Sequence, residues 1–164
     1  MAIDRASKVA FAELRPRVKR VVAVEVLRRV LDKPPCEVHT VLTDNGVQFT
    51  PQAQQFLPGG HSSARTCREC GVEHRLTKPA HPWTNGWVDR TNRTLKKAPV
   101  QHFHYRTTQE LNEHLQAVLL ACDHANRLKT LRGFTPHEFV CAQWLNTPAI
   151  FTRDPTHLTL GLYN

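Results

Sequence analysis

Alternating and helical patterns of apolar positions divide the first part of the chain into strands and one helix. Residues 8–14 alternate and are rich in strand formers, and residues 37–43 form a second strand-like run. Between them, residues 18–31 carry apolar side chains at broadly helical spacing, and Pro34 and Pro35 end this helix. The segment before the first strand is predicted to hold the end of a preceding strand at residues 2–4 and a turn at residues 5–7.

The middle of the chain alternates short elements with polar loops. Residues 64–70 are typical of a short helix that ends at Gly71, and residues 72–76 of a short strand. Residues 77–86 form a polar, proline-rich loop. Because threonine and asparagine cap helices well, the next helix is predicted to begin near Thr84 or Asn85 and to run to about Ala98, before Pro99.

The last part is predicted to be helical. Thr107 or Thr108 opens a helix, and Pro136 takes the first position of a final helix that Thr135 begins. The side chains expected to form the buried face of the earlier helix are Leu111, Leu115, Val118, Leu119 and Cys122. Strands come early and helices late, so the order predicts an α/β domain with helices packed on a mixed sheet.

Composition and net charge indicate which kind of molecule the chain binds. The chain has 164 residues, of which 40% are hydrophobic and 22% charged, which is ordinary for a globular domain. Apolar runs do not reach membrane-spanning length and the start lacks a signal pattern, so we expect a cytoplasmic protein without membrane contact. The net charge of +8 favours a polyanionic partner, nucleic acid above all, although charge alone is a weak signal.

The five cysteines leave two interpretations open. Cys67 and Cys70 form a C-x-x-C pair, and a zinc site would need two further ligands, for which His61 and His74 are the candidates. The spacing does not repeat as a second pair of ligands. Free thiols in a reducing compartment are therefore the favoured interpretation.

Four ordered segments carry a recognisable signature. The first holds Leu42, Thr43, Asp44, Asn45, Gly46 and Phe49; the second Lys78, Pro79, His81, Pro82, Asn85 and Gly86; the third Val88, Asp89, Arg90, Asn92, Arg93, Leu95 and Lys96; the last Asn126, Arg127, Leu128, Leu131, Gly133, Thr135, Pro136 and Glu138. Together they resemble the integrase-type core of insertion-sequence transposases, a DDE family that is similar to retroviral integrase cores. The resemblance covers nearly the whole chain and implies a ribonuclease-H-like α/β fold, a mixed sheet flanked by helices.

The resemblance also implies a metal-dependent chemistry. Members of this family use three carboxylates to hold two divalent ions, Mg²⁺ or Mn²⁺, which suit hard oxygen ligands. Asp44 matches the second carboxylate; the alternative is an aspartate that caps the Asn45-Gly46 turn. Asp89 falls where the family usually has glutamate and is one methylene shorter; the alternative is a helix-start aspartate favoured by the helix dipole.

The family's first carboxylate lies on a strand upstream of the segment that residues 2–7 resemble. Asp4 is the only early aspartate, and its place near the strand at residues 8–14 favours a turn role over a catalytic one. The resemblance therefore indicates a core that is incomplete at its N-terminus, with the first strand missing. We assign residues 1–146 to the integrase-type core and residues 147–164 to a C-terminal tail.

DNA contacts are expected beside the metal cleft. Helical spacing puts Asp89 and Lys96 on one face with Asn92 or Arg93, and Trp83 in the preceding loop could stack on a base. The alternative is an ordinary solvated face. The residues expected to contact DNA are Lys78, Asn85, Arg90, Arg93, Lys96 and Lys97.

The resulting hypothesis is a transposase core for DNA integration by metal-dependent phosphodiester strand transfer. The apparent lack of a first carboxylate and the aspartate at position 89 favour weak or absent catalysis. The competing hypothesis is a non-catalytic remnant that binds DNA or forms dimers. In either case we expect DNA and further copies of the chain, in a homo-oligomer, as partners.

Overall fold

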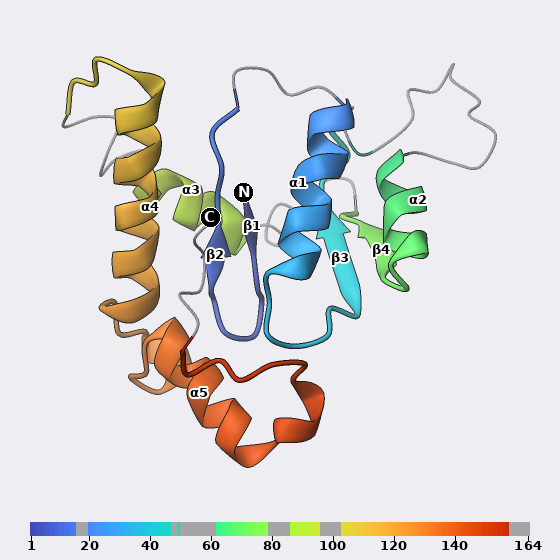
Figure 1. Ribbon diagram of the computed structural model, residues 1–164, viewed down its shortest axis with the longest axis vertical. Coiled ribbons are helices and arrows are strands. Elements are labelled where there is room, and N and C mark those ends of the chain that lie inside the picture. Colours follow the sequence, from blue (N-terminus) through green and yellow to red (C-terminus); the bar gives the residue numbers. More distant parts are fainter. Residues whose placement is uncertain (16–19, 47–48, 50–61, 79–85, 96–102, 158–164) are drawn as a thin grey trace. The chain divides into compact units, whose positions relative to one another are not determined.

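The computed structural model describes residues 1–15, 20–46, 49, 62–78, 86–95 and 103–157, which are drawn in colour in Figure 1. The chain forms two compact units. The first unit consists of Met1–Leu14, Pro35–Glu37 and Gly86–Asn164, and the second of Arg15–Pro34 and Val38–Asn85. The elements of the first unit are β1 (Ala2–Ile3), β2 (Ala10–Phe11), α3 (Gly86–Leu95), α4 (Thr108–His124), η3 (Lys129–Leu131), α5 (Pro136–Asn146) and η4 (Pro148–Ile150). Those of the second are α1 (Arg20–Asp32), β3 (Thr40–Thr43), α2 (Ser62–Glu69) and β4 (Glu73–Leu76).

A short antiparallel hairpin packs on α4 at the centre of the first unit. β1 pairs with β2 in the register Ala2 to Phe11 and Ile3 to Ala10. Residues 9–12 are all buried, although successive side chains of a strand point to opposite faces. The core cluster consists of Ala10, Ala12, Leu115 and Leu119. Of the strand predicted over 8–14, only Ala10 and Phe11 pair with another strand. Both faces of this strand are covered.

Local capping chemistry fixes the starts of the two long helices of this unit, as predicted. The Thr107 side chain accepts a hydrogen bond from the backbone N–H of Glu110 at the start of α4. At the start of α5, Thr135 and Glu138 form a reciprocal capping box, and Pro136 takes the first helical turn. On the predicted buried face of α4, Leu115 and Leu119 are buried, and the other three side chains are half-buried.

The segment after Asn146 packs on an earlier part of the same unit. Cys36 makes an isolated antiparallel bridge with Phe151, and the backbone N–H of Thr152 donates to the carbonyl of Pro35 at 2.7 Å. The Phe151 ring also lies edge-on to Trp144 of α5, with centroids 5.5 Å apart. The strand predicted over 37–43 begins only at Thr40. The division into a core at residues 1–146 and a tail at residues 147–164 stays a prediction.

The second unit contains a parallel strand pair with two helices. β3 pairs with β4 from Thr40 opposite Glu73 to Thr43 opposite Leu76. α2 contacts both β4 and α1, and it is followed by Gly71, whose φ of +70° lets the chain reverse. The short helix ending at a glycine and the strand after it were both predicted. In the described parts of the chain, no helix has the length and apolar character needed to span a membrane.

Candidate functional site

Asp44 lies directly after the carboxyl end of β3, where its side chain is exposed. One carboxylate oxygen, Oδ1, accepts a hydrogen bond from the backbone N–H of Gly46 at 2.9 Å. This is the turn-capping contact that the sequence left open as an alternative. Because the contact engages one oxygen of an exposed carboxylate, capping the turn and binding an ion at the other oxygen are compatible.

The turn that carries Asp44 is braced against β4. The Asn45 amide donates to the carbonyl of Thr77 at 3.0 Å, and the Thr77 N–H donates to the carbonyl of Thr43 at 2.9 Å. Lys78, whose side chain is exposed, follows Thr77 immediately. The carboxyl ends of parallel strands meet at one edge of a sheet, so an acidic and a basic residue, Asp44 and Lys78, leave the same edge of this strand pair.

His74 supports the last residue of β3. Its Nε2 lies 2.9 Å from the Thr43 hydroxyl oxygen in a hydrogen bond. Partial burial lowers the pKa of the His74 imidazole, which favours the neutral ring. The sequence suggested His74 only as a possible zinc ligand. In the structure, it holds the strand end that leads into Asp44.

Helix α3 carries the second candidate carboxylate and two of the expected DNA contacts. Asp89 lies in the first turn, and its side chain is exposed together with those of Arg90 and Arg93. α3 packs on β1 and α4, and Val88, Thr91 and Asn92 are half-buried. Asp89 and Arg93 are one turn apart, so the predicted charged face exists over this part of the helix. Asn85, Lys96, Lys97 and Trp83 lie outside the described residues.

Asp4 belongs to the hairpin turn, as the sequence favoured. Its carboxylate accepts hydrogen bonds from the backbone N–H groups of Ala6 and Ser7, at 3.2 and 2.8 Å, and from the Ser7 hydroxyl. These bonds close the turn between β1 and β2. Both carboxylate oxygens are engaged in the turn, which supports a structural role for Asp4.

The C-x-x-C pair is part of the α2 packing. Cys67 is fully buried, and burial raises the pKa of its thiol, with Cys70 adding to the effect. Cys70 is exposed at the end of the helix. Among the residues that the structure describes, no three histidine, cysteine or acidic side chains gather to hold a metal ion. His61 lies outside those residues.

Helix α4 carries a buried acid that the pattern of apolar positions did not predict. Asp123 is 1% exposed and accepts a hydrogen bond from the backbone N–H of Ala10 at 3.4 Å. Among the residues that the structure describes, its second oxygen, Oδ2, finds no hydrogen-bond partner. Burial raises the pKa of the Asp123 carboxyl to about 8, against a small opposing effect of the Ala10 N–H. The helical pattern indicated the face of α4 but not the depth at which this residue sits.

The donor set of the two candidate carboxylates suits a hard divalent cation. Asp44 and Asp89 are both exposed, and each offers the oxygen ligands that Mg²⁺ and Mn²⁺ prefer. Asp44 belongs to the second unit and Asp89 to the first. Their convergence on one ion therefore stays a prediction.

Comparisons with known proteins agree with the resemblance drawn from the sequence. Residues 70–136 match the integrase core domain family. The chain is 31% identical over 117 residues to the Gag-Pol polyprotein of Walleye dermal sarcoma virus, covering 71% of the chain and 6% of that protein. It is 26% identical over 101 residues to an uncharacterized protein of Caenorhabditis elegans, covering 59% of the chain and 7% of that protein. The chain thus spans a small part of the length of both relatives.

The fold of the chain is similar to that of a solved integrase core. The catalytic core domain of BIV integrase superimposes with a TM-score of 0.64 at 18% identity, over 88% of this chain and 86% of that one. The fold is therefore ribonuclease-H-like, of the integrase catalytic-core class, as the sequence predicted. The family match over residues 70–136 is to the same kind of domain, an integrase core.

Proposed function

We propose that the chain is a transposase-type integrase core that acts on DNA by metal-dependent phosphodiester strand transfer. The observation that carries the proposal is the exposed Asp44 at the carboxyl end of β3, in a turn braced by Asn45 to Thr77, within an integrase-core fold. By the resemblance drawn from the sequence, Asp44 would correspond to the family's second metal-binding carboxylate. A rigid turn keeps the carboxylate in place without the entropy loss of ordering a loop on binding.

The residues have distinct roles in this proposal. Asp44 and Asp89 would hold Mg²⁺ or Mn²⁺, and a bound pair of divalent ions supplies activation of the attacking hydroxyl and stabilisation of the leaving oxygen. Lys78, at the same strand edge as Asp44, would contact a phosphate of the strand being cut. Arg90 and Arg93, beside Asp89, would orient the duplex through its backbone. A homo-oligomer and a cytoplasmic location stay predictions.

The proposal is tested by incubating the chain with supercoiled plasmid DNA in Mn²⁺ and measuring nicked and joined products. We expect metal-dependent products that Asp44→Asn abolishes and that Asp154→Asn, a change to an exposed aspartate of the first unit, leaves intact. Products that persist in Asp44→Asn would overturn the metal assignment. DNA binding without any product in Mn²⁺ would overturn the catalytic proposal in favour of the non-catalytic, DNA-binding alternative.

A further inference from the structure

A hollow of about 370 Å³ opens between the η3 loop and helix α5, within the first unit. Its volume lies in the range of small-ligand sites, roughly 300–1,000 Å³. The surface of the hollow is mainly apolar, with a smaller polar part. The residues that matter for its chemistry are Leu131, Arg132, Phe134, Phe139, Gln143 and Asn146.

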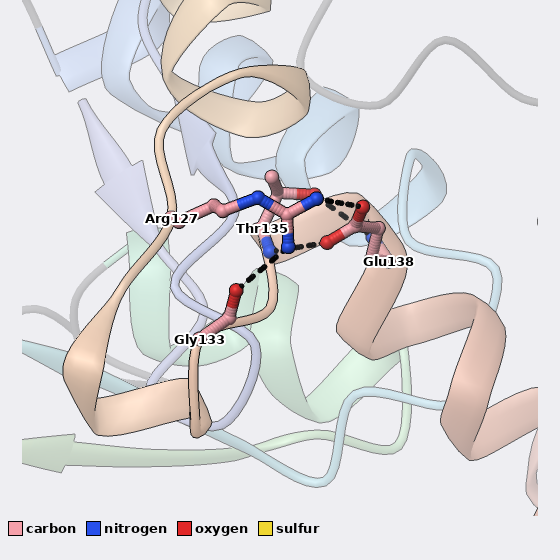
Figure 2. A network of polar contacts seen from close by, with 4 residues as sticks. All are labelled: Arg127, Gly133, Thr135 and Glu138. Carbon is pink, nitrogen blue, oxygen red and sulfur yellow. Dashed lines mark hydrogen bonds and ion pairs between the residues drawn. The ribbon is translucent and has the colours of Figure 1, made fainter.

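A polar network holds the wall of the hollow in place (Figure 2). The guanidinium of Arg127 donates to the carbonyl of Gly133 at 2.9 Å and to the Glu138 carboxylate at 3.0 Å. The other Glu138 oxygen accepts from the backbone N–H of Thr135 at 2.9 Å. These bonds tie the η3 loop to the first turn of α5, so the hollow is formed before any ligand arrives.

Arg132 adopts a backbone conformation that is unfavourable for its residue type. Its φ is 56°, in the left-handed region, and the following Gly133 has a φ of 88°. A residue with a Cβ is disfavoured there relative to glycine. The conformation is held by the Arg132 N–H donating to Lys129 O and the Gly133 N–H donating to Leu128 O. Arg132 is thus a lining residue of the hollow at a backbone position that suits glycine.

The lining groups match the parts of a nucleotide. Phe134 is 43% exposed and Phe139 is half-buried, so both rings offer apolar surface on which a base can stack. Gln143 and Asn146 each carry a donor and an acceptor, which can pair with the edge of a base. The exposed Arg132 is suited to a phosphate.

We propose that this hollow binds one unpaired nucleotide of a DNA strand, an inference that rests on the proposed function because it takes DNA as the partner. An apolar peptide side chain would use the rings but would leave the guanidinium and both amides without a purpose. The chain's net charge of +8 also favours a phosphate-bearing occupant. The hollow is formed by η3 and α5, whereas the candidate carboxylates lie on α3 and after β3.

The test is a titration of the ¹⁵N-labelled chain with thymidine 5′-monophosphate, followed by amide chemical shifts, with inorganic phosphate in a parallel titration. We expect shifts confined to residues 130–134 and 139–146 for the nucleotide and a weaker response, limited to the surroundings of Arg132, for phosphate. Equal responses to both, or nucleotide shifts outside these segments only, would overturn the proposal. Preferential binding of an apolar peptide probe in the hollow would do the same.

Two variants separate a binding role from a structural one. Arg132→Gly removes the guanidinium and relaxes the backbone, so the variant should be at least as stable as the parent while its affinity for a single-stranded oligonucleotide falls several-fold. Phe139→Leu keeps an apolar side chain but removes the ring, and affinity should fall about tenfold. The matched control is Arg153→Gln, an exposed arginine that is not among the lining residues, which should keep full affinity. Unchanged affinity in both variants would contradict the proposal.

The inference and the proposed function fail in different ways. Strand transfer by a chain that shows no nucleotide shifts at the hollow would remove only the nucleotide site. Nucleotide binding at the hollow by a chain without metal-dependent products would remove only the catalytic proposal.

Discussion

The carboxyl group of Asp123 accepts a hydrogen bond from the backbone N–H of Ala10, 3.4 Å away, and thereby joins the last turn of α4 to strand β2. The two residues are 113 positions apart in the chain. The contact lies at the centre of the first unit, because Ala10 is part of the core cluster and Asp123 is 1% exposed. An acid in this place makes the stability of the unit depend on pH.

We predict that Asp123→Asn stabilises the protein, and increasingly so as pH rises. The carboxyl has a pKa of about 8 in the folded chain and near 3.8 when unfolded. The unfolded chain therefore loses this proton first, and stability falls as pH rises from about 4 to about 8. Asparagine keeps the acceptor for Ala10 and does not titrate. Urea unfolding at pH 5 and pH 8 should show a larger gain at pH 8; an equal gain at both would contradict the assignment.

Removing the α5 cap should destabilise the first unit. Thr135 is 2% exposed and accepts the N–H of Glu138, so Thr135→Ala should lower the free energy of unfolding by about 1 kcal/mol. Thr130→Ala, at an exposed threonine of η3, is the matched control and should change it little. The measurement is chemical unfolding of both variants. If Thr130→Ala lowered the free energy of unfolding as much as Thr135→Ala, the loss would not be due to the cap.

The pH dependence of the same cap has the opposite sign to that of Asp123. Hydrogen bonding from the Thr135 backbone, and the charge of Arg127, lower the pKa of the Glu138 carboxyl. Its stabilising effect should therefore be present above pH 4.5 and be lost as pH falls through the lowered folded-state value. Glu138→Gln should abolish that dependence, measured as the difference in unfolding midpoint between pH 6 and pH 3. If the parent and Glu138→Gln lost the same amount of stability on acidification, Glu138 would not be the source of the pH dependence.

Neutralising the exposed face of α3 should weaken DNA binding without regard to sequence. Arg93→Gln on α3, and Lys96→Ala at the next basic position of the sequence, should each reduce the slope of log affinity against log salt by about one, because each removes a proposed phosphate contact. Arg65→Gln, at an exposed arginine of α2 that pairs with Glu69, is the control. Fluorescence anisotropy on two unrelated duplexes is the measurement. A slope that neither change reduces would mean that α3 does not contact DNA.

Lengthening the carboxylate of α3 should raise any Mg²⁺-dependent activity. Asp89 is one methylene shorter than the glutamate usual at this position of the resembled family, and Mg²⁺ tolerates little deviation from octahedral geometry. Asp89→Glu should therefore increase product formation in Mg²⁺ more than in Mn²⁺, measured as initial rates. Lower rates of Asp89→Glu in both metals would show that the shorter side chain is the one this site requires.

Helix caps, helix ends and turns, which depend on neighbouring residues, were predictable from the sequence. Thr107 and Thr135 cap their helices, Gly71 follows a helix end, and the turn at Asp44 ends β3, because each depends on side chains within a few residues. These contacts need no knowledge of the rest of the fold.

Features that depend on distant contacts were not predictable. Asp123 contacts β2, more than a hundred residues earlier, and Cys36 makes a bridge with Phe151, 115 positions later. The hollow beside α5 arises from the left-handed backbone of Arg132 and from the hydrogen bonds of Arg127. The spacing of apolar residues predicts neither feature. The role of Asp44 was predictable only in part, since its turn is local but its metal partner is not.

The central claim is that Asp44 and Asp89 bind the same divalent ion. Its most direct measurement is an anomalous difference map from crystals of the chain grown with Mn²⁺ and a DNA duplex. We predict a manganese peak within about 2.0–2.6 Å of a carboxylate oxygen from each of the two residues. A map in which manganese contacts only one of them, or neither, would contradict the claim.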